Sequence, residues 1–325
     1  MHRRHFLVAG SGIALAAGIP SGIRYAAASA ESEAAPMDVA AFHASRQFGA
    51  TPFGRIAWVE RGEGPAALFL HGLPLNGYQW RGALDRLQTI RRCIAPDFMG
   101  LGYSEIPEGQ SLSPHAQAEM LAAFLDTLGI MAVDLVASDS GGAVAQLFVV
   151  KYPNRVRTLL LTNCDVHEDS PPPPLLPVIA ASRVGTFADE VLVPQLTDRA
   201  KSLLPNGLAG CCYTRPAELT DETIACYLEP LVSTPLRKQQ LHDYCIALER
   251  NPLVAIEPEL KRCQVPMRVV WGTADTIFDA AGPDWLDRTF PRSRGVRRIE
   301  GANLFFQEEM PDIIAEEARN LWLAV

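Results

Sequence analysis

Short apolar runs alternate with helix-like patterns along the chain from residue 54 onward. Seven runs have the length of buried strands, at residues 54–59, 66–70, 92–95, 133–137, 156–161, 267–271 and 296–299. Between them, apolar residues recur at helical spacing, as in the segment from Ala143 to Tyr152 that Pro153 ends. This alternation predicts an α/β fold with a doubly wound, mostly parallel sheet.

The alternation stops after the strand predicted at 156–161. A loop with four consecutive prolines begins near Asp169, and mostly helical patterns then continue to about Pro258. Open α/β sheets place their binding sites at the carboxyl ends of the strands. We therefore expect residues 169–258 to form a helical cap over that edge, and residues 31–168 and 259–325 to form the core.

One strand–helix junction has an acidic residue at its turn. The apolar run 133–137 is followed by Ser138, Asp139 and Ser140, and then by two glycines that open the next helical pattern. Strand, sharp turn and helix are the context of a nucleophile elbow, whose flanking residues must be small. The motif fits with Asp139 or with Ser140 at the apex, and we favour Asp139 because it leaves the strand unbroken. The alternative is that Asp139 simply caps the helix.

Three further motifs surround this junction in the sequence. His71-Gly72-Leu73-Pro74 follows one predicted strand, a D-x-x-G-x-G-x-S turn occupies residues 97–104, and Asp275 follows the strand at 267–271. Together the motifs resemble the α/β-hydrolase superfamily, and within it the branch of epoxide hydrolases and haloalkane dehalogenases. The resemblance extends from about Phe53 to the C-terminus and places the cap after the sixth strand of the superfamily plan.

The resemblance implies a particular chemistry for the elbow. Asp139 would attack an sp³ carbon, displacing a halide or opening an epoxide, and would leave an alkyl ester on the enzyme. The backbone N–H groups of Leu73 and Ser140 would form the oxyanion hole. Water would then hydrolyse the ester, activated by a histidine that an acid such as Asp275 orients. No metal or organic cofactor is implied, and the substrate is expected to be small and rather apolar.

Three positions depart from the family pattern. No histidine follows His242, and the place of the family's histidine falls on Leu304 or Asn303, depending on the direction of counting within 301–311. Leu73 and Ser140 also stand where haloalkane dehalogenases have the Asn and Trp that hold the halide. We therefore expect inefficient dehalogenation of the usual kind. A non-hydrolytic lyase or isomerase, or a small-ligand binder on a degenerate scaffold, is the alternative function.

Other side chains are candidates for the missing roles. Asp165 and His167 follow the strand at 156–161, which lies beside the elbow strand, so either is a candidate substitute base. Epoxide hydrolases use two cap tyrosines to protonate the leaving oxygen, which makes candidates of Tyr213, Tyr227 and Tyr244. Most cap tyrosines simply pack, and His167 is equally compatible with a solvated loop.

The N-terminus has the pattern of an export signal. Arg3-Arg4 precedes an apolar stretch, and Ala28-Ser29-Ala30 matches an A-x-A cleavage site. We expect residues 1–30 to be a bacterial twin-arginine signal peptide, with the export machinery as a partner and a periplasmic or secreted product. Glycines and a proline in the stretch favour this over a stable membrane anchor. The net charge of -8 gives no footprint for nucleic acid.

The seven cysteines are an odd number, and no spacing among them matches a zinc site. Cys211 and Cys212 are adjacent, so they cannot easily close a normal bridge with each other. We interpret the cysteines as small buried hydrophobic residues. One disulfide formed after export is the alternative.

Overall fold

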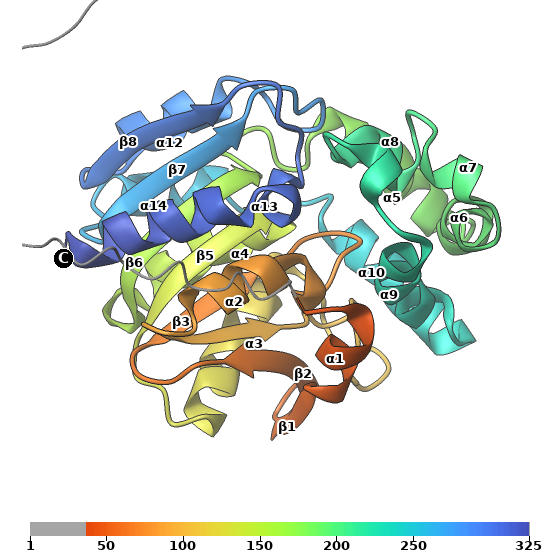
Figure 1. The fold of residues 1–325 in the computed structure, drawn as a ribbon, viewed down its shortest axis with the longest axis horizontal. Helices are drawn as coiled ribbons and strands as arrows, with labels where there is room; N and C mark the ends of the chain where they lie inside the picture. The colour runs from red at the N-terminus through yellow and green to blue at the C-terminus, as the bar shows by residue number, and fades with distance from the viewer. Residues whose placement is uncertain (1–36, 325) are drawn as a thin grey trace, which may run out of the picture. The chain divides into compact units, whose positions relative to one another are not determined.

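The computed structural model describes residues 37–324, so the predicted signal segment 1–30 lies outside the described residues. Eight strands form one sheet in the order β1-β2-β4-β3-β5-β6-β7-β8 (Figure 1). The strands are β1 (Gln47–Thr51), β2 (Gly54–Arg61), β3 (Ala66–Leu70), β4 (Arg92–Pro96), β5 (Val133–Asp139), β6 (Val156–Cys164), β7 (Met267–Gly272) and β8 (Ser293–Ile299).

The sheet is antiparallel at one edge and parallel elsewhere. β2 pairs antiparallel with both β1 and β4, and the remaining pairs are parallel. The sequence prediction missed β1, because this edge strand is largely exposed and contains no apolar run. The other seven predicted strands are present, most of them a residue or more longer than their apolar runs. The α/β class and the doubly wound, mostly parallel sheet are confirmed.

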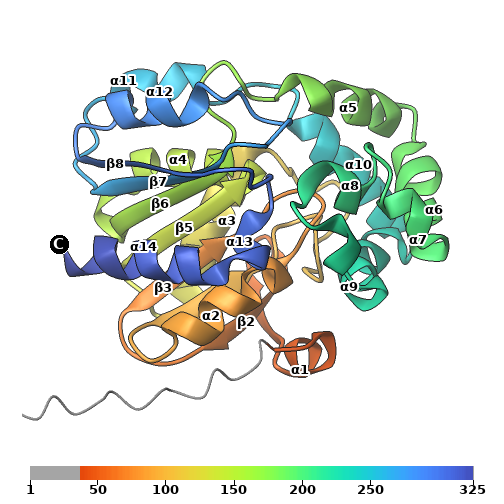
Figure 2. The same ribbon diagram turned by 45° about the horizontal axis from the view of Figure 1, so that its top comes forward.

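Alternate residues of each central strand face opposite layers of helices. Along β5, Leu135 and Ala137 belong to one hydrophobic cluster, whereas Val136 belongs to a second cluster with residues of α2 and α14. Figure 2 shows the sheet between these layers. The core helices are α1 (Val39–Ala44), η1 (Gly77–Trp80), α2 (Arg81–Leu87), α3 (Pro114–Thr127), α4 (Ser140–Lys151), η2 (Pro153–Arg155), α11 (Glu257–Leu260), α12 (Gly282–Thr289), α13 (Phe306–Glu309) and α14 (Pro311–Leu323).

The segment between β6 and β7 is helical, as the sequence pattern predicts, and its helices gather at one end of the sheet (Figures 1 and 2). Among the described residues, none of the helices is both long and apolar enough to cross a bilayer. Apart from α11, the helices of this segment are η3 (Pro173–Leu175), α5 (Leu176–Arg183), η4 (Phe187–Leu192), α6 (Val193–Thr197), α7 (Arg199–Ser202), α8 (Leu208–Cys212), η5 (Pro216–Glu218), α9 (Asp221–Val232), α10 (Pro235–Ala247) and η6 (Val254–Ile256).

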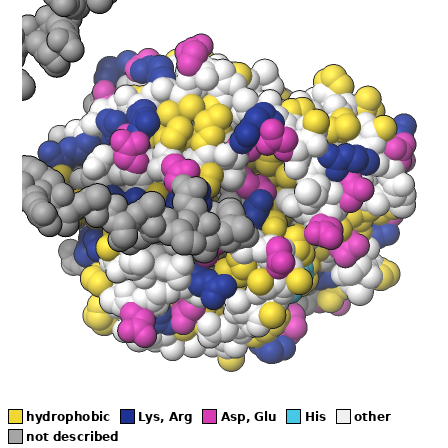
Figure 3. Space-filling view, viewed as in Figure 1, with side chains coloured by type: hydrophobic (Ala, Val, Ile, Leu, Met, Phe, Trp, Pro, Cys, Tyr) yellow, Lys and Arg dark blue, Asp and Glu magenta, His cyan; other side chains and the backbone are white. Residues whose placement is uncertain are grey.

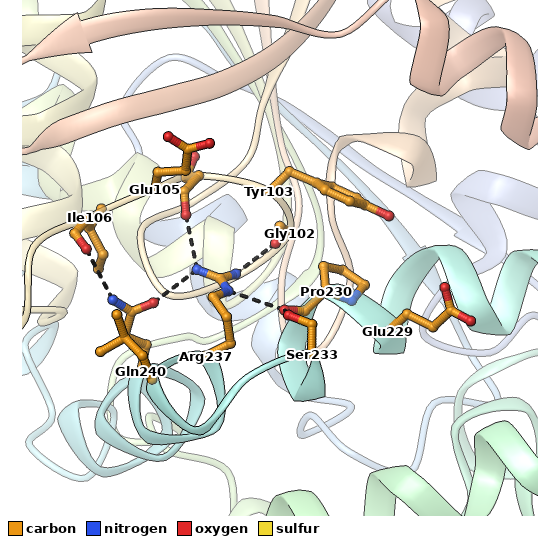
Figure 4. A pocket seen from close by; sticks show the side chains of 11 residues that line it. Gly102, Tyr103, Glu105, Ile106, Glu229, Pro230, Ser233, Arg237 and Gln240 are labelled. Carbon is orange, nitrogen blue, oxygen red and sulfur yellow. Dashed lines mark hydrogen bonds between the residues drawn. The ribbon is translucent and has the colours of Figure 1, made fainter.

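Arg237 of α10 fastens these helices to the core. Its guanidinium donates to the backbone oxygens of Gly102 (2.6 Å) and Ser104 (2.9 Å), and also to the Pro230 carbonyl (3.1 Å) and the Gln240 side chain (3.0 Å) (Figure 4). A surface cleft of about 430 Å³ lies beside this contact. Because four acceptors occupy the guanidinium, we assign it a role in holding α10 on the D-x-x-G-x-G-x-S turn.

The outer surface carries charges of both signs. On the face in Figure 3, basic and acidic side chains alternate with apolar groups over both the core and the helical segment. Over the described part of the chain, many charged side chains form exposed ion pairs, such as Arg55 with Glu105 and Arg183 with Glu249. Pairs of this kind add little stability, so the apolar layers on the two faces of the sheet hold the fold together.

Candidate active site

Asp139 lies at the turn between β5 and α4 with a strained backbone. Its φ is 56° and its ψ is -139°, a conformation that L residues rarely adopt and that marks functional turns. The turn leaves no room for side chains at the flanking glycines: a β-carbon on Gly141 would collide with the His71 carbonyl, and one on Gly142 with Cys164. Asp139 therefore lies at the apex of a tight strand–helix turn with small neighbours, and its role as a nucleophile stays a prediction.

One carboxylate oxygen of Asp139 is held by two backbone amides. Oδ1 accepts hydrogen bonds from the Leu73 N–H (3.0 Å) and the Ser140 N–H (2.5 Å). Burial raises the pKa of Asp139, and the two amide donors oppose that rise by stabilising the anion. His71 fixes the loop that carries Leu73, since its Nε2 accepts from the Phe98 N–H at 3.0 Å. The amides thus lie where the sequence predicts an oxyanion hole.

A buried polar network supports the elbow from behind. The amide nitrogen of Gln307 donates to the hydroxyls of Ser138 (3.1 Å) and Thr162 (2.6 Å), and Gln79 approaches both Ser138 and Gln307 at 3.4 Å. All four side chains are buried. The network ties the end of β5, one residue before Asp139, to β6, α13 and η1.

The side chain of Asp139 lines a cavity of about 580 Å³. The other lining residues come mainly from the loops at the carboxyl ends of the strands and from the helical segment between β6 and β7. The size of the cavity lies within the range of small-molecule sites. The polar side chains on its wall include Asp139, Ser140 and Asp165. The remaining wall is mainly apolar, with contributions from Leu73, Pro74, Leu175, Val178, Phe187, Leu192, Ile277, Phe278 and Leu304.

Asp275 is bonded to an amide side chain. Its Oδ2 accepts from Asn163 Nδ2 at 2.8 Å, and its Oδ1 accepts from the Ile277 N–H at 2.8 Å. Asn163 is itself locked to both the N–H and the carbonyl of Gly272. Burial raises the pKa of Asp275 to about 6, while these neutral donors lower it only in part. Sequence reasoning missed Asn163, because a single Asn after a strand carries no signal of its own.

The loop after β8 places Leu304 rather than Asn303 in the cavity. Leu304 is buried in the cavity wall. The Asn303 amide instead donates to the Cys211 carbonyl at 3.0 Å, and its side-chain oxygen accepts from the Leu304 N–H. Of the two alignments for the family's histidine, counting back from Gln307 is therefore the one that reaches the cavity.

The two candidates after β6 occupy different environments. Asp165 is buried and lines the cavity, and burial together with the nearby Asp139 carboxylate raises its pKa well above the usual range. His167 is absent from the cavity wall. Its ring stacks on Trp285 with centroids 4.7 Å apart, and its Nε2 lies 3.1 Å from a Glu257 oxygen. The structure thus brings Asp165, and not His167, together with Asp139.

None of the three candidate tyrosines lines the cavity. The hydroxyls of Tyr213 and Tyr227 donate to Glu308 at 2.7 and 2.8 Å, and the same carboxylate accepts from Arg81. Tyr244 shares a hydrogen bond of 2.9 Å with Ser140 Oγ behind the wall. Their placement corrects the expectation of substrate contacts: Tyr213 and Tyr227 bind the cap to the core, and Tyr244 braces the elbow.

Comparisons with known proteins agree with this fold. The family model described as alpha/beta hydrolase fold matches residues 65–309. Haloalkane dehalogenase 2 of Mycobacterium tuberculosis is 34% identical over 284 residues, covering 81% of this chain and 89% of that protein.

Two solved structures share the fold at lower identity. An epoxide hydrolase without ligand has a TM-score of 0.69 at 22% identity, covering 86% of this chain and 98% of its own. A loop variant of a haloalkane dehalogenase from Bradyrhizobium elkanii has a TM-score of 0.66 at 23% identity, covering 86% and 98%.

The fold and the site together define an α/β-hydrolase. The chain belongs to the alpha/beta hydrolase family, with haloalkane dehalogenases and epoxide hydrolases among its relatives, and it is a hydrolase.

Proposed function

We propose that this hydrolase opens epoxides, and less efficiently displaces halides, on small apolar molecules through nucleophilic attack by Asp139. The observation that carries the proposal is the Asp139 carboxylate, which faces an apolar cavity from a strained turn while two backbone amides hold one oxygen. A buried carboxylate in this arrangement is oriented before the substrate arrives.

Asp165 supplies the proton for ring opening in this proposal. A free oxygen of Asp139 attacks an epoxide carbon, the ring C–O bond breaks, and the alkoxide takes the proton that the raised pKa keeps on Asp165. The product of this step is a hydroxyalkyl ester on Asp139 and an ionised Asp165. A halide needs no proton when it leaves, but Leu73 and Ser140 replace the side chains that hold it in the resembled dehalogenases.

Hydrolysis of the ester is the slow step. Leu304 occupies the cavity wall where the alignment places the family's histidine, and its side chain cannot accept a proton. The ionised Asp165 is the base that remains: it accepts a proton from water as the water attacks the ester carbonyl. The amides of Leu73 and Ser140 hold the resulting oxyanion until the diol leaves. A carboxylate is a weaker base than histidine, so the ester should accumulate.

Leu304 in place of a histidine also supports a second candidate function. If Asp165 does not activate water, the cavity still binds a small apolar ligand, and the protein acts as a binder or as a non-hydrolytic lyase or isomerase. The two candidates differ in whether a covalent ester on Asp139 forms and decays.

Intact-mass spectrometry tests the proposal directly. The wild-type protein, Asp139→Asn and Asp139→Ala are incubated with 1,2-epoxyhexane or 1-bromohexane, and peptide mapping locates any adduct. We expect an ester on Asp139 in the wild type that decays slowly, and none in either variant. Failure of both reagents to label Asp139, with no diol or alcohol released, would contradict the proposal and favour the binder.

We also propose that the enzyme acts in the periplasm or outside the cell. The support is the twin-arginine pattern and the A-x-A motif of residues 1–30, which lie outside the described residues. Protein purified from its native host should begin near Glu31. Replacing Arg3 and Arg4 with lysine should leave the precursor in the cytoplasm, and an intact N-terminus on active wild-type protein would refute the export.

A further inference from the structure

Two adjacent thiols lie in the wall of the cavity that Asp139 enters. Cys211 and Cys212 end helix α8, both line the cavity, and both are free in the structure. Their Sγ atoms are 2.8 Å apart. All seven cysteines fall within residues 37–324, and among them this pair alone has its sulfurs in contact.

The backbone of the pair is fixed by the loop that carries Leu304. The Cys211 carbonyl accepts from Asn303 Nδ2 at 3.0 Å, and the Cys212 carbonyl accepts from the Phe305 N–H at 2.9 Å. Both carbonyls are thus held by one loop, which anchors the backbone of the pair at the end of α8.

Reactivity differs between the two thiols. Cys211 is only partly buried and opens to the cavity, whereas Cys212 is buried. A hydrogen bond from the Cys212 thiol lowers the pKa of Cys211, and the same contact with burial raises the pKa of Cys212. Cys211 is thus the thiol that attacks first, because the thiolate is the reactive form.

We propose that Cys211 and Cys212 are a reversible modification site, a vicinal dithiol that closes to a disulfide in the cavity wall. Oxidised glutathione, or another small disulfide, is the oxidant. The Cys211 thiolate attacks one of its sulfurs and releases one glutathione thiolate. Cys212 then loses its proton and attacks the Cys211 sulfur, which expels the second glutathione. Two protein thiols become one disulfide and two glutathione thiols form, so the electrons balance.

The bridge is expected to be labile. Consecutive Cα atoms across a trans peptide are about 3.8 Å apart, below the usual disulfide range of about 4.4–6.8 Å. A bond closed under such strain is easily reduced, as are the disulfides that serve regulatory roles. It closes almost no loop, so it adds little stability through chain entropy. We therefore expect this disulfide to form and break reversibly. A disulfide that stabilises the fold would join cysteines farther apart in the sequence.

The test titrates the purified full-length chain with oxidised glutathione and maps its peptides. The variants are Cys211→Ser and Cys212→Ser, with Cys263→Ser, outside the cavity, as the matched control. We expect the wild type and the control to lose two reactive thiols per chain, with the bridge on the peptide that holds residues 211 and 212. Mild reduction should restore both thiols. Each cavity variant should form no bridge, and Cys212→Ser should instead retain one glutathione on Cys211.

A second probe reports the reduced pair without relying on the variants. Phenylarsine oxide binds two neighbouring thiols at once, so it should protect Cys211 and Cys212 from maleimide in the reduced wild type. It should fail to do so after oxidation. The proposal is overturned if both thiols stay free at full oxidation, if either bridges to another cysteine, or if the wild type stops at a stable glutathione adduct. None of these readouts involves Asp139, so they remain informative if the proposed hydrolysis fails.

Discussion

The Asp275→Asn variant tests whether Asp275 is a buried carboxylate without a charged partner. The wild-type carboxyl group is bonded to the Asn163 amide and the Ile277 N–H, and burial raises its pKa from 3.8 to about 6. An acid whose pKa is raised by folding stabilises the folded state only while it is protonated. That contribution is complete below the unfolded pKa of 3.8 and is lost as the pH rises through about 6.

The size of the effect follows from the shift. A pKa change of about two units corresponds to about 3 kcal/mol between the fully protonated and fully ionised limits. Between about pH 4 and about pH 7, most of this difference, about 2 kcal/mol, should appear. The amide variant does not titrate. It also places an N–H beside the Asn163 amide, but that cost is the same at every pH and cancels in the pH dependence.

Urea denaturation across the pH range measures the difference. The free energy of unfolding of Asp275→Asn minus that of the wild type should increase by about 2 kcal/mol from about pH 4 to about pH 7. Asp243→Asn, at an exposed position of α10, is the matched control for the carboxylate-to-amide change. A difference that stays constant with pH would show that folding does not shift the pKa of Asp275, and one that decreases as the pH rises would show that Asp275 is stabilised as an anion; either result would refute the reasoning.

Three further predictions concern the proposed chemistry and the cap. Leu304→His should raise epoxide turnover by ~10²–10⁴-fold by restoring a general base, whereas the apolar control Leu304→Met should not; equal rates would exclude this position as the missing base. Asp165→Asn should slow labelling of Asp139 by an epoxide by roughly 10²-fold but leave labelling by a bromoalkane unchanged, and raising the pH should slow epoxide labelling of the wild type as Asp165 loses its proton; parallel losses with both reagents would remove the acid role. Glu308→Gln should lower the free energy of unfolding by about 3 kcal/mol, since it leaves Arg81 without its buried partner, whereas Glu105→Gln on the exposed pair with Arg55 should cost less than about 1 kcal/mol; a similar small cost in urea denaturation for both would contradict the role of Glu308.

Sequence patterns were sufficient to locate those parts of the site that are built from consecutive residues. The elbow needs an apolar strand, an apex residue and small neighbours within a few positions, so Asp139 and the amides of Leu73 and Ser140 could be located from the sequence. The other seven strands, β2 to β8, follow from apolar runs for the same reason. β1 could not be predicted, because it pairs at an open edge and buries little surface.

Side-chain direction could not be predicted, because it depends on partners distant in the sequence. The hydroxyls of Tyr213 and Tyr227 turn to Glu308, which lies 95 and 81 residues away. The sequence alone does not distinguish Leu304 from Asn303, because the contact that turns the Asn303 amide away from the cavity is with the Cys211 carbonyl, 92 residues back. The same separation hides the partnership of Asn163 with Asp275, 112 residues apart.

Two carboxyl groups in one apolar cavity can have different protonation states when their surroundings differ. Burial penalises the anion at both Asp139 and Asp165, but backbone amides are aimed at the Asp139 carboxylate and stabilise its charge. Asp165 faces that charge, which raises its own pKa further. The first ionisation therefore belongs to the group at the elbow, and the remaining proton stays on Asp165. In the proposed mechanism these two aspartates would therefore serve as nucleophile and proton donor, the combination that ring opening of an epoxide requires.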